Sequence, residues 1–167
     1  NRSLKRRFLL DAVEAVGPTV RDGVDEAEAT FRLPNATFKA LYEAGLFWLK
    51  LPEVLGGAEA DPLIQIEVIA ALAEIDASAA WSVMIGSQST GLPAAWLPDD
   101  ALAVVFGDGP TPVAAGSLMP SGTAEREPGG YRVNGRWAFA SGINHCDWVN
   151  ATVRFEDGSS DGLASFR

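Results

Sequence analysis

Apolar positions recur along the chain with two different periods, first that of a helix and later the alternation of β-strands. Over residues 4–16 they repeat near every 3.6 residues, which predicts an amphipathic helix. Gly17 and Pro18 are expected to end this helix and start the next. Residues 19–30 are acidic and thinly apolar, so the second helix is expected at the surface, with a solvated charged face or, alternatively, a binding face.

The following segments combine helix signals with a connector. Pro34 is placed to open a third helix, and Gly45 fits the position just past its end. Residues 46–52 are expected to run extended as a buried connector. Asp61 followed by Pro62 predicts a capped helix start, because the carboxylate accepts backbone N–H groups and proline fits the first turn.

Two apolar helices are predicted in the middle of the chain. Residues 63–75 are apolar on nearly all sides, which is typical of a helix buried by its neighbours. A second apolar helix carries Trp81 on a face that usually packs in a core. The small polar segment 87–93 is expected to be a loop from which Ser89 or Thr90 contacts a ligand.

The last part of the chain has the pattern of strands. A short helix capped by Asp99 is expected to end at Gly107, and a Gly/Pro-rich linker follows it. Strands are then predicted over 113–119, 131–134, 136–141, 148–155 and 163–166. Helices followed by strands indicate an α+β fold, with an all-α domain over 1–108 and the start of an antiparallel β-barrel or sandwich domain over 109–167.

Residues 129–142 carry the most distinctive pattern of the chain. The Asn-Gly pair at 134–135 favours a tight hairpin turn, because both residues tolerate positive φ. After it, Trp137, Phe139 and Ser141 alternate at period two and are expected on one face of a strand. Aromatic rings beside a hydroxyl suit a planar heteroaromatic ligand, whereas a packed sandwich core with a satisfied serine is the alternative.

Charge and cysteine content limit the classes of partner. The net charge is -9 and the sequence pI is about 4.5, which argues against a nucleic-acid partner or an anionic membrane surface. No apolar run approaches the roughly 20 residues of a membrane span, and the N-terminus has no signal-sequence pattern. The single cysteine, Cys146, has no internal disulfide partner, so a reducing cytoplasm is the expected location.

Other chemistries find weaker support in the sequence. No glycine fingerprint for a nicotinamide cofactor follows a strand, and one histidine with one cysteine at non-zinc spacing does not predict a metal site. Ser141, His145 and Asp147 would allow a hydrolase triad, but no nucleophile-elbow sequence surrounds the serine. For His145, an acid–base role and a hydrogen bond that shapes a loop both remain open. Cys146 is interpreted as a buried small residue.

The run at 129–142, GGYRVNGRWAFASG, resembles the flavin motif in the middle domain of the acyl-CoA dehydrogenase superfamily. It is most similar to the branch of reduced-flavin-dependent two-component monooxygenases. Supporting matches follow in the family's order: Leu51-Pro52-Glu53 with Gly56-Gly57, Ala80-Trp81, Gly116-Ser117-Leu118-Met119-Pro120 with Gly122 and Ala124, and His145 with Asp147-Trp148.

The resemblance implies a set of site residues. Phe139 falls where the dehydrogenases usually stack a Trp near the flavin, and Ser141 falls where a hydroxyl donates to the nitrogen of the central flavin ring. It implies further flavin contacts at Trp137, Ser117, Leu118, Gly122 and Thr123. It implies substrate contacts at Trp81, Ser89, Ser117 and Met119.

The same resemblance implies a function and partners. A separate flavin reductase would supply reduced FMN or FAD, and a flavin hydroperoxide formed with O2 would hydroxylate an aromatic or polycyclic small molecule. A homotetramer is expected. Members of the family continue into a C-terminal helical bundle, so this chain is expected to be part of a longer protein, with any catalytic base in the missing part.

One departure from the dehydrogenase pattern favours the monooxygenase branch. The dehydrogenases usually carry Thr-Glu-Pro and then Gly-Ser-Asp, whereas this chain reads Leu-Met-Pro at 118–120 and Ser-Gly-Thr-Ala at 121–124. The alternatives are an acyl-CoA dehydrogenase with bound FAD and a truncated, non-catalytic interaction module.

Overall fold

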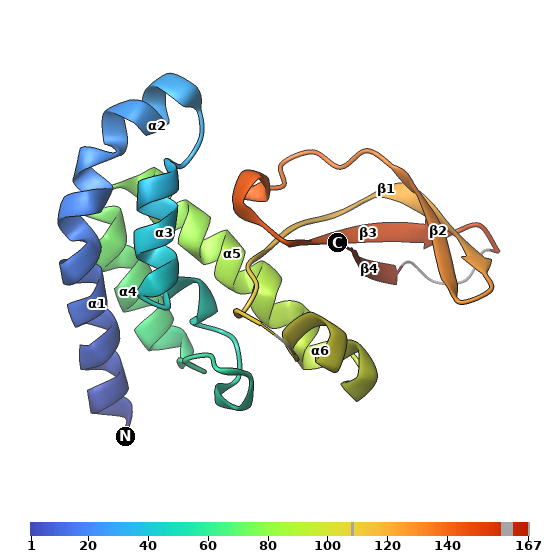
Figure 1. Ribbon diagram of the computed structural model, residues 1–167, viewed down its shortest axis with the longest axis horizontal. Coiled ribbons are helices and arrows are strands. Elements are labelled where there is room, and N and C mark those ends of the chain that lie inside the picture. Colours follow the sequence, from blue (N-terminus) through green and yellow to red (C-terminus); the bar gives the residue numbers. More distant parts are fainter. Residues whose placement is uncertain (108, 158–161, 167) are drawn as a thin grey trace.

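The helices gather at one end of the molecule and the sheet at the other (Figure 1). The computed structural model describes residues 1–107, 109–157 and the backbone of 162–166. The α-helices are α1 (Arg2–Asp22), α2 (Val24–Thr30), α3 (Asn35–Glu43), α4 (Pro62–Ala73), α5 (Ala77–Trp96) and α6 (Asp99–Phe106). Short 3-10 turns are η1 (Leu46–Trp48), η2 (Glu53–Leu55) and η3 (Ile143–His145). The strands are β1 (Ala114–Glu127), β2 (Gly130–Gly135), β3 (Trp148–Phe155) and β4 (Gly162–Phe166).

The first helix does not end where the sequence predicts. Helix α1 continues through Gly17 and Pro18 to Asp22, so the predicted break there is wrong. Pro18 is exposed, whereas Gly17 and Val20 are buried, so packing on the inner face holds a helix that the missing N–H only weakens. The expected extended connector at 46–52 is also wrong in part, because η1 occupies its first residues.

Each of the two central helices begins at an aspartate cap, and the first of these caps, Asp61, is the one that the sequence predicted. Asp61 Oδ1 accepts from Leu63 N at 3.0 Å and from Ile64 N at 3.1 Å. Asp76 Oδ1 accepts from Ala79 N at 2.6 Å, which starts α5. Asp99 is the first residue of α6 but makes no side-chain cap bond, so its predicted capping role is wrong.

The predicted loop at 87–93 is helical and lies inside α5. Pro93 has no N–H to donate to the carbonyl of Ser89, four residues earlier. Asn150 Nδ2 from β3 donates to that carbonyl at 2.6 Å instead. Thr90 Oγ1 accepts from Ala114 N of β1 at 3.0 Å. These buried polar groups therefore find hydrogen-bond partners in the sheet, so the polar segment can stay helical and does not have to face water as a loop.

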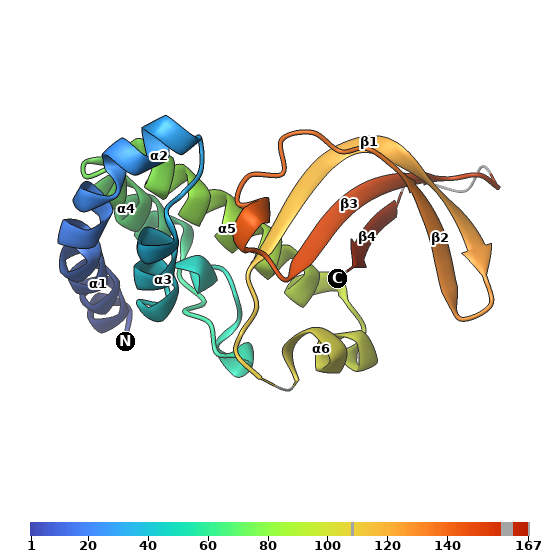
Figure 2. The same cartoon turned by 45° about the horizontal axis from the view of Figure 1, so that its top comes forward.

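The four strands form one mixed sheet in the order β2-β1-β3-β4. β1 and β3 are parallel, and the two outer pairs are antiparallel. Figure 2 shows β1 and β3 curving together away from α5. The predicted α+β order is therefore confirmed, as are the strands predicted at 131–134, 148–155 and 163–166.

The hairpin turn lies elsewhere than predicted. β1 and β2 are joined at Pro128-Gly129, where Gly129 has φ +86°. The predicted turn residues at 134–135 are the end of β2, where Gly135 pairs with Gly122. The paired residues Gly122 and Gly135 leave room for the Trp137 indole ring, and this packing overrules the local preference of Asn-Gly for a turn.

The predicted strand at 136–141 is also wrong, because these residues form an irregular segment. Trp137 lies over Gly122, where an added Cβ would come within 2.2 Å of its Cζ2 atom. Its Nε1 donates to Thr152 O at 2.9 Å. Phe139 has φ +60° and is 94% exposed, so Trp137 and Phe139 do not share a strand face with Ser141.

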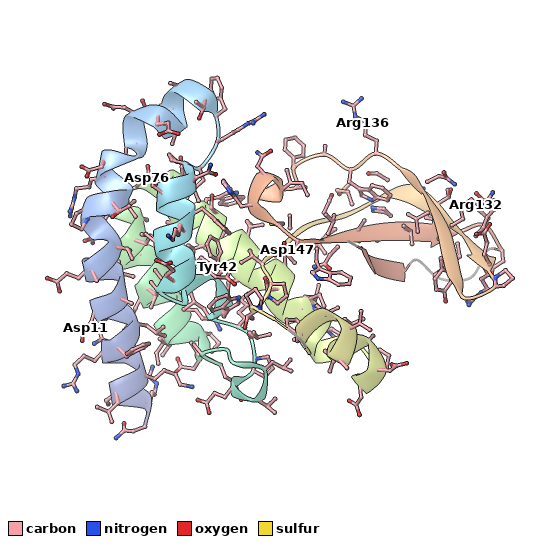
Figure 3. The ribbon with its side chains drawn as sticks, viewed as in Figure 1. Asp11, Tyr42, Asp76, Arg132, Arg136 and Asp147 are labelled. Atoms are coloured by element: carbon pink, nitrogen blue, oxygen red, sulfur yellow. The ribbon has the colours of Figure 1, made fainter. Side chains whose placement is uncertain are left out.

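Hydrogen bonds also fix the junction between helices and sheet. Tyr42 Oη donates to Thr111 O at 2.9 Å, and Trp48 Nε1 donates to Pro112 O at 3.1 Å. Burial, and then the charge of Asp147, raise the pKa of Tyr42 above its ordinary value. Figure 3 labels Tyr42 and Asp147 in the centre, between the helices and the sheet. Within the described ranges, no helix is both long and apolar enough to cross a membrane.

Candidate functional site

A cleft of about 640 Å³ lies where the helical part meets the irregular segment before β3. One wall is the end of α2 with the α2–α3 connection, defined as residues 31–34. The other wall is the start of α5 with the turn at 141–145. The lining residues are Ala27, Glu28, Phe31, Arg32, Leu33, Ala77, Ser78, Trp81, Ser82, Ser141, Gly142, Asn144 and His145.

A hydrogen bond joins the two predicted site residues in this cleft. Trp81 Nε1 donates to Ser141 Oγ at 3.1 Å. The indole is 54% exposed, so Trp81 is a wall of the cleft and its apolar helix face is not closed into the core. Because Ser141 Oγ accepts this bond, its own hydrogen stays available for donation to an acceptor in the cleft.

The backbone around Ser141 forms a tight sequence of turns. Ser141 N donates to Phe139 O at 2.9 Å, and Ile143 N donates to Ala140 O at 3.2 Å. Gly142 has φ +83°, a conformation that suits glycine. The chain leaves the sheet earlier, at the end of β2, and these turns bring the Ser141 hydroxyl against α5.

His145 and Cys146 connect this turn to the helices. His145 Nε2 lies 2.8 Å from Leu33 O, and its ring stacks on Phe38. Cys146 Sγ donates to Gly142 O at 3.1 Å. Burial, and then the charge of Asp147, raise the pKa of Cys146 to about 12, so its thiol stays protonated at neutral pH.

The other predicted flavin contacts lie along β1. Leu118 and Met119 are each 68% exposed, whereas Ser117 and Gly122 are buried. Residues 118–121 lie where the register between β1 and β3 shifts, between Ser117 and Gly122, and they precede the part of β1 that pairs with β2. Thr123 is exposed and paired with both neighbours. None of these residues lines the cleft.

Ser89 lies apart from the cleft. It is buried between α5 and the sheet, and its hydroxyl oxygen would be 3.2 Å from a Cβ added at Gly116. The structure therefore brings Trp81 and Ser141 together, while Ser89 and the β1 residues lie elsewhere.

Sequence reasoning missed the wall formed by Phe31, Arg32 and Leu33. Phe31 ends α2 in a left-handed conformation, with φ +55°, and is 93% exposed. In the sequence, the signal for this wall is a single phenylalanine that follows an acidic helix. Its pairing with Trp81 across a cleft depends on tertiary structure.

The chain belongs to the acyl-CoA dehydrogenase family, because residues 5–96 match the family's profile for "Acyl-CoA dehydrogenase, N-terminal domain". This match covers the helices that form the cleft, including Phe31 and Trp81.

Its relatives include oxygenases that use flavin. The chain is 34% identical over 141 residues to the oxygenase subunit HsaA of a flavin-dependent monooxygenase from Rhodococcus jostii, covering 84% of this chain and 36% of that protein. It is 31% identical over 140 residues to the oxygenase component of an FADH2-dependent resorcinol hydroxylase from Rhizobium. This match covers 84% of this chain and 34% of that protein. The chain thus spans little more than a third of these relatives.

A solved structure shares the fold over nearly the whole chain. XiaF from Streptomyces, in complex with FADH2 and glycerol, superposes with a TM-score of 0.88 at 36% identity. The match covers 98% of this chain and 42% of XiaF.

Proposed function

We propose that this chain is part of the oxygenase component of a two-component flavin-dependent monooxygenase that hydroxylates an aromatic or polycyclic small molecule. The observation that carries the proposal is the hydrogen bond from Trp81 to Ser141 at the wall of the cleft. Family membership and the flavin-dependent relatives support it. A separate reductase supplies the reduced flavin, as either FMN or FAD.

The residues present fit a flavin. Phe139 offers an exposed ring in a fixed left-handed conformation two residues from Ser141. The register shift at 118–121 interrupts the ladder between β1 and β3, so backbone C=O groups there, and N–H groups other than at Pro120, could meet the polar edge of a planar ring. Ser141 has a hydrogen to donate to a ring nitrogen. When bound, the reduced flavin supplies the electrons and the site at which O2 is activated.

In this proposal the side chains of the chain orient and shield the reacting groups. Ser141 would donate its hydrogen to the central ring, and the bond from Trp81 would fix the direction of that hydroxyl. Leu118, Met119 and Phe139 have exposed side chains that would offer apolar surface to the flavin and limit water near it. Trp81 and Phe31 present aromatic walls to a flat substrate in the cleft.

A direct test uses the full-length protein with reduced FAD or FMN, oxygenated buffer and a panel of phenols and indoles. We expect a hydroxylated product for at least one compound and less hydrogen peroxide than free reduced flavin releases. Peroxide release equal to that of free flavin, with every compound and both flavins, would contradict the proposal.

The same preparation tests the dehydrogenase alternative. Tightly bound yellow FAD that an acyl-CoA bleaches without oxygen would indicate an acyl-CoA dehydrogenase. We propose, in addition, a helical domain over 1–108 and a β domain over 109–167, a homotetramer and a cytoplasmic location. Each of these is a prediction for the full-length protein.

A further inference from the structure

His145 makes a directed hydrogen bond to the opposite wall of the cleft. Its Nε2 atom lies 2.8 Å from the backbone oxygen of Leu33, 112 residues earlier in the chain. A carbonyl oxygen only accepts hydrogen bonds, so Nε2 carries the hydrogen and donates it. The bond therefore joins η3 to the α2–α3 connection.

The plane of the imidazole is fixed as well. It stacks on Phe38 of α3, with ring centroids 4.5 Å apart and an interplanar angle of 11°. Phe38 is itself held against Phe47, at 5.2 Å between centroids. A hydrogen bond sets the ring's position and the stack sets its plane, so His145 is an anchor with one orientation.

The anchor is tied closely to Ser141. His145 N donates to Gly142 O at 3.0 Å, and Cys146 Sγ donates to the same oxygen. Only three residues separate Ser141 from His145, and the turn between them is closed by these bonds. Ser141 and His145 therefore lie at the two ends of one hydrogen-bonded turn.

We propose that His145 is a positioning residue: it holds Ser141 in register with Trp81 and fixes the distance between the two walls of the cleft. It acts through Leu33 and Phe38 and does not touch the reacting atoms. The part of this inference that concerns Ser141 and flavin rests on the proposed function.

The first test measures the anchor without flavin. In the full-length protein, His145→Phe retains a ring for the stack on Phe38 but loses the donor to Leu33. Hydrogen exchange followed by mass spectrometry should show the segment 141–147 exchanging about tenfold faster, the effect of one lost hydrogen bond. His145→Gln retains a donor and should lie nearer the wild type. If His145→Phe does not fold, His145→Gln alone carries the measurement, with a smaller expected increase.

The second test asks whether His145 acts through Ser141. His145→Phe should raise the KM for substrate, because the walls of the cleft are no longer held at a fixed distance, and should also raise the fraction of reduced flavin lost as hydrogen peroxide. In a Ser141→Ala background the same substitution should add little, because the group it positions is already absent.

These measurements separate the two proposals. Unchanged exchange at 141–147 would overturn the anchor, and additive effects of the His145 and Ser141 substitutions would overturn its action through Ser141. A wild-type protein that forms no product would overturn the proposed function alone, and the exchange experiment would still decide the anchor.

Discussion

Trp81 and Ser141 are sixty residues apart in sequence, yet the indole nitrogen of one donates to the hydroxyl oxygen of the other at 3.1 Å. The bond occupies an acceptor site of Ser141 and leaves its hydrogen free. This relationship couples a helix of the N-terminal part to the segment that the flavin motif predicts. The following predictions test its consequences.

Replacing Ser141 by Ala should uncouple flavin oxidation from product formation. We expect hydrogen peroxide release to rise by up to about tenfold, the effect of one lost hydrogen bond to the cofactor, with little loss of fold. Ser82→Ala is a matched control, since Ser82 also lines the cleft but donates to Ser78 O within α5. Equal product yields in both variants would contradict the role of Ser141.

Replacing Phe139 by Ala should weaken flavin binding without destabilising the protein. The ring is 94% exposed, so its removal loses almost no buried surface. Loss of an aromatic stack should raise the Kd for flavin by about 3- to 10-fold, as measured by fluorescence titration. Trp96→Ala removes another exposed aromatic, 79% exposed at the end of α5, and should leave the Kd unchanged. A flavin Kd unaffected by Phe139→Ala would remove this residue from the site.

Two substitutions at Phe31 separate backbone strain from the loss of its ring. Phe31 adopts φ +55°, which costs a non-glycine residue about 1–2 kcal/mol. Phe31→Gly should therefore raise the free energy of unfolding by about 0.5–1 kcal/mol after the entropic cost of glycine, whereas Phe31→Ala should not. Denaturant unfolding measures this difference.

Both Phe31 variants lack the aromatic wall, so both should raise the KM for an aromatic substrate to a similar extent. A lower stability of Phe31→Gly would show that the ring makes stabilising contacts. A KM unchanged in both would show that Phe31 lies outside the substrate path.

Cys146 should resist alkylation at neutral pH. Burial and Asp147 raise the pKa of its thiol to about 12 from 9.0, so at pH 8 we expect alkylation on the order of a hundredfold or more slower than in the unfolded chain. Between about pH 9 and pH 12 the thiol of the unfolded chain is ionised, while the thiol of the folded protein stays protonated. The free energy of unfolding should therefore fall as pH rises above about 9. Cys146→Ala should remove this part of the slope, and rapid labelling of folded protein at pH 8 would refute the burial of the thiol.

The sequence predicted those features of the fold that depend only on neighbouring residues. Asp61 caps the helix that it precedes, as predicted, because a cap needs only the next turn of chain. The predictions failed where residues distant in sequence determine the local conformation. Gly135 was assigned to a turn but faces Gly122 beneath Trp137, and neither glycine reveals that indole in its own neighbourhood.

The candidate site shows the same division. Resemblance singled out Ser141 and Trp81 separately, but their hydrogen bond depends on the irregular segment that follows β2, in which Phe139 has a left-handed backbone conformation. Ser89 was expected at a ligand because its segment is polar, yet that polarity joins α5 to the sheet. The wall at Phe31 had no distinctive pattern, since exposed residues after a helix are common in sequences.

The acceptor for His145 is the backbone oxygen of Leu33, so the anchor does not depend on which side chains occupy the α2–α3 connection. Phe31 and Arg32, the exposed residues of that connection, line the cleft beside it. If the proposed function holds, substitutions at these two positions can therefore reshape the wall that meets the substrate while the attachment to the Ser141 turn persists. This separation gives the protein a route to evolve a new substrate range in small steps, with the cofactor side of the site left intact.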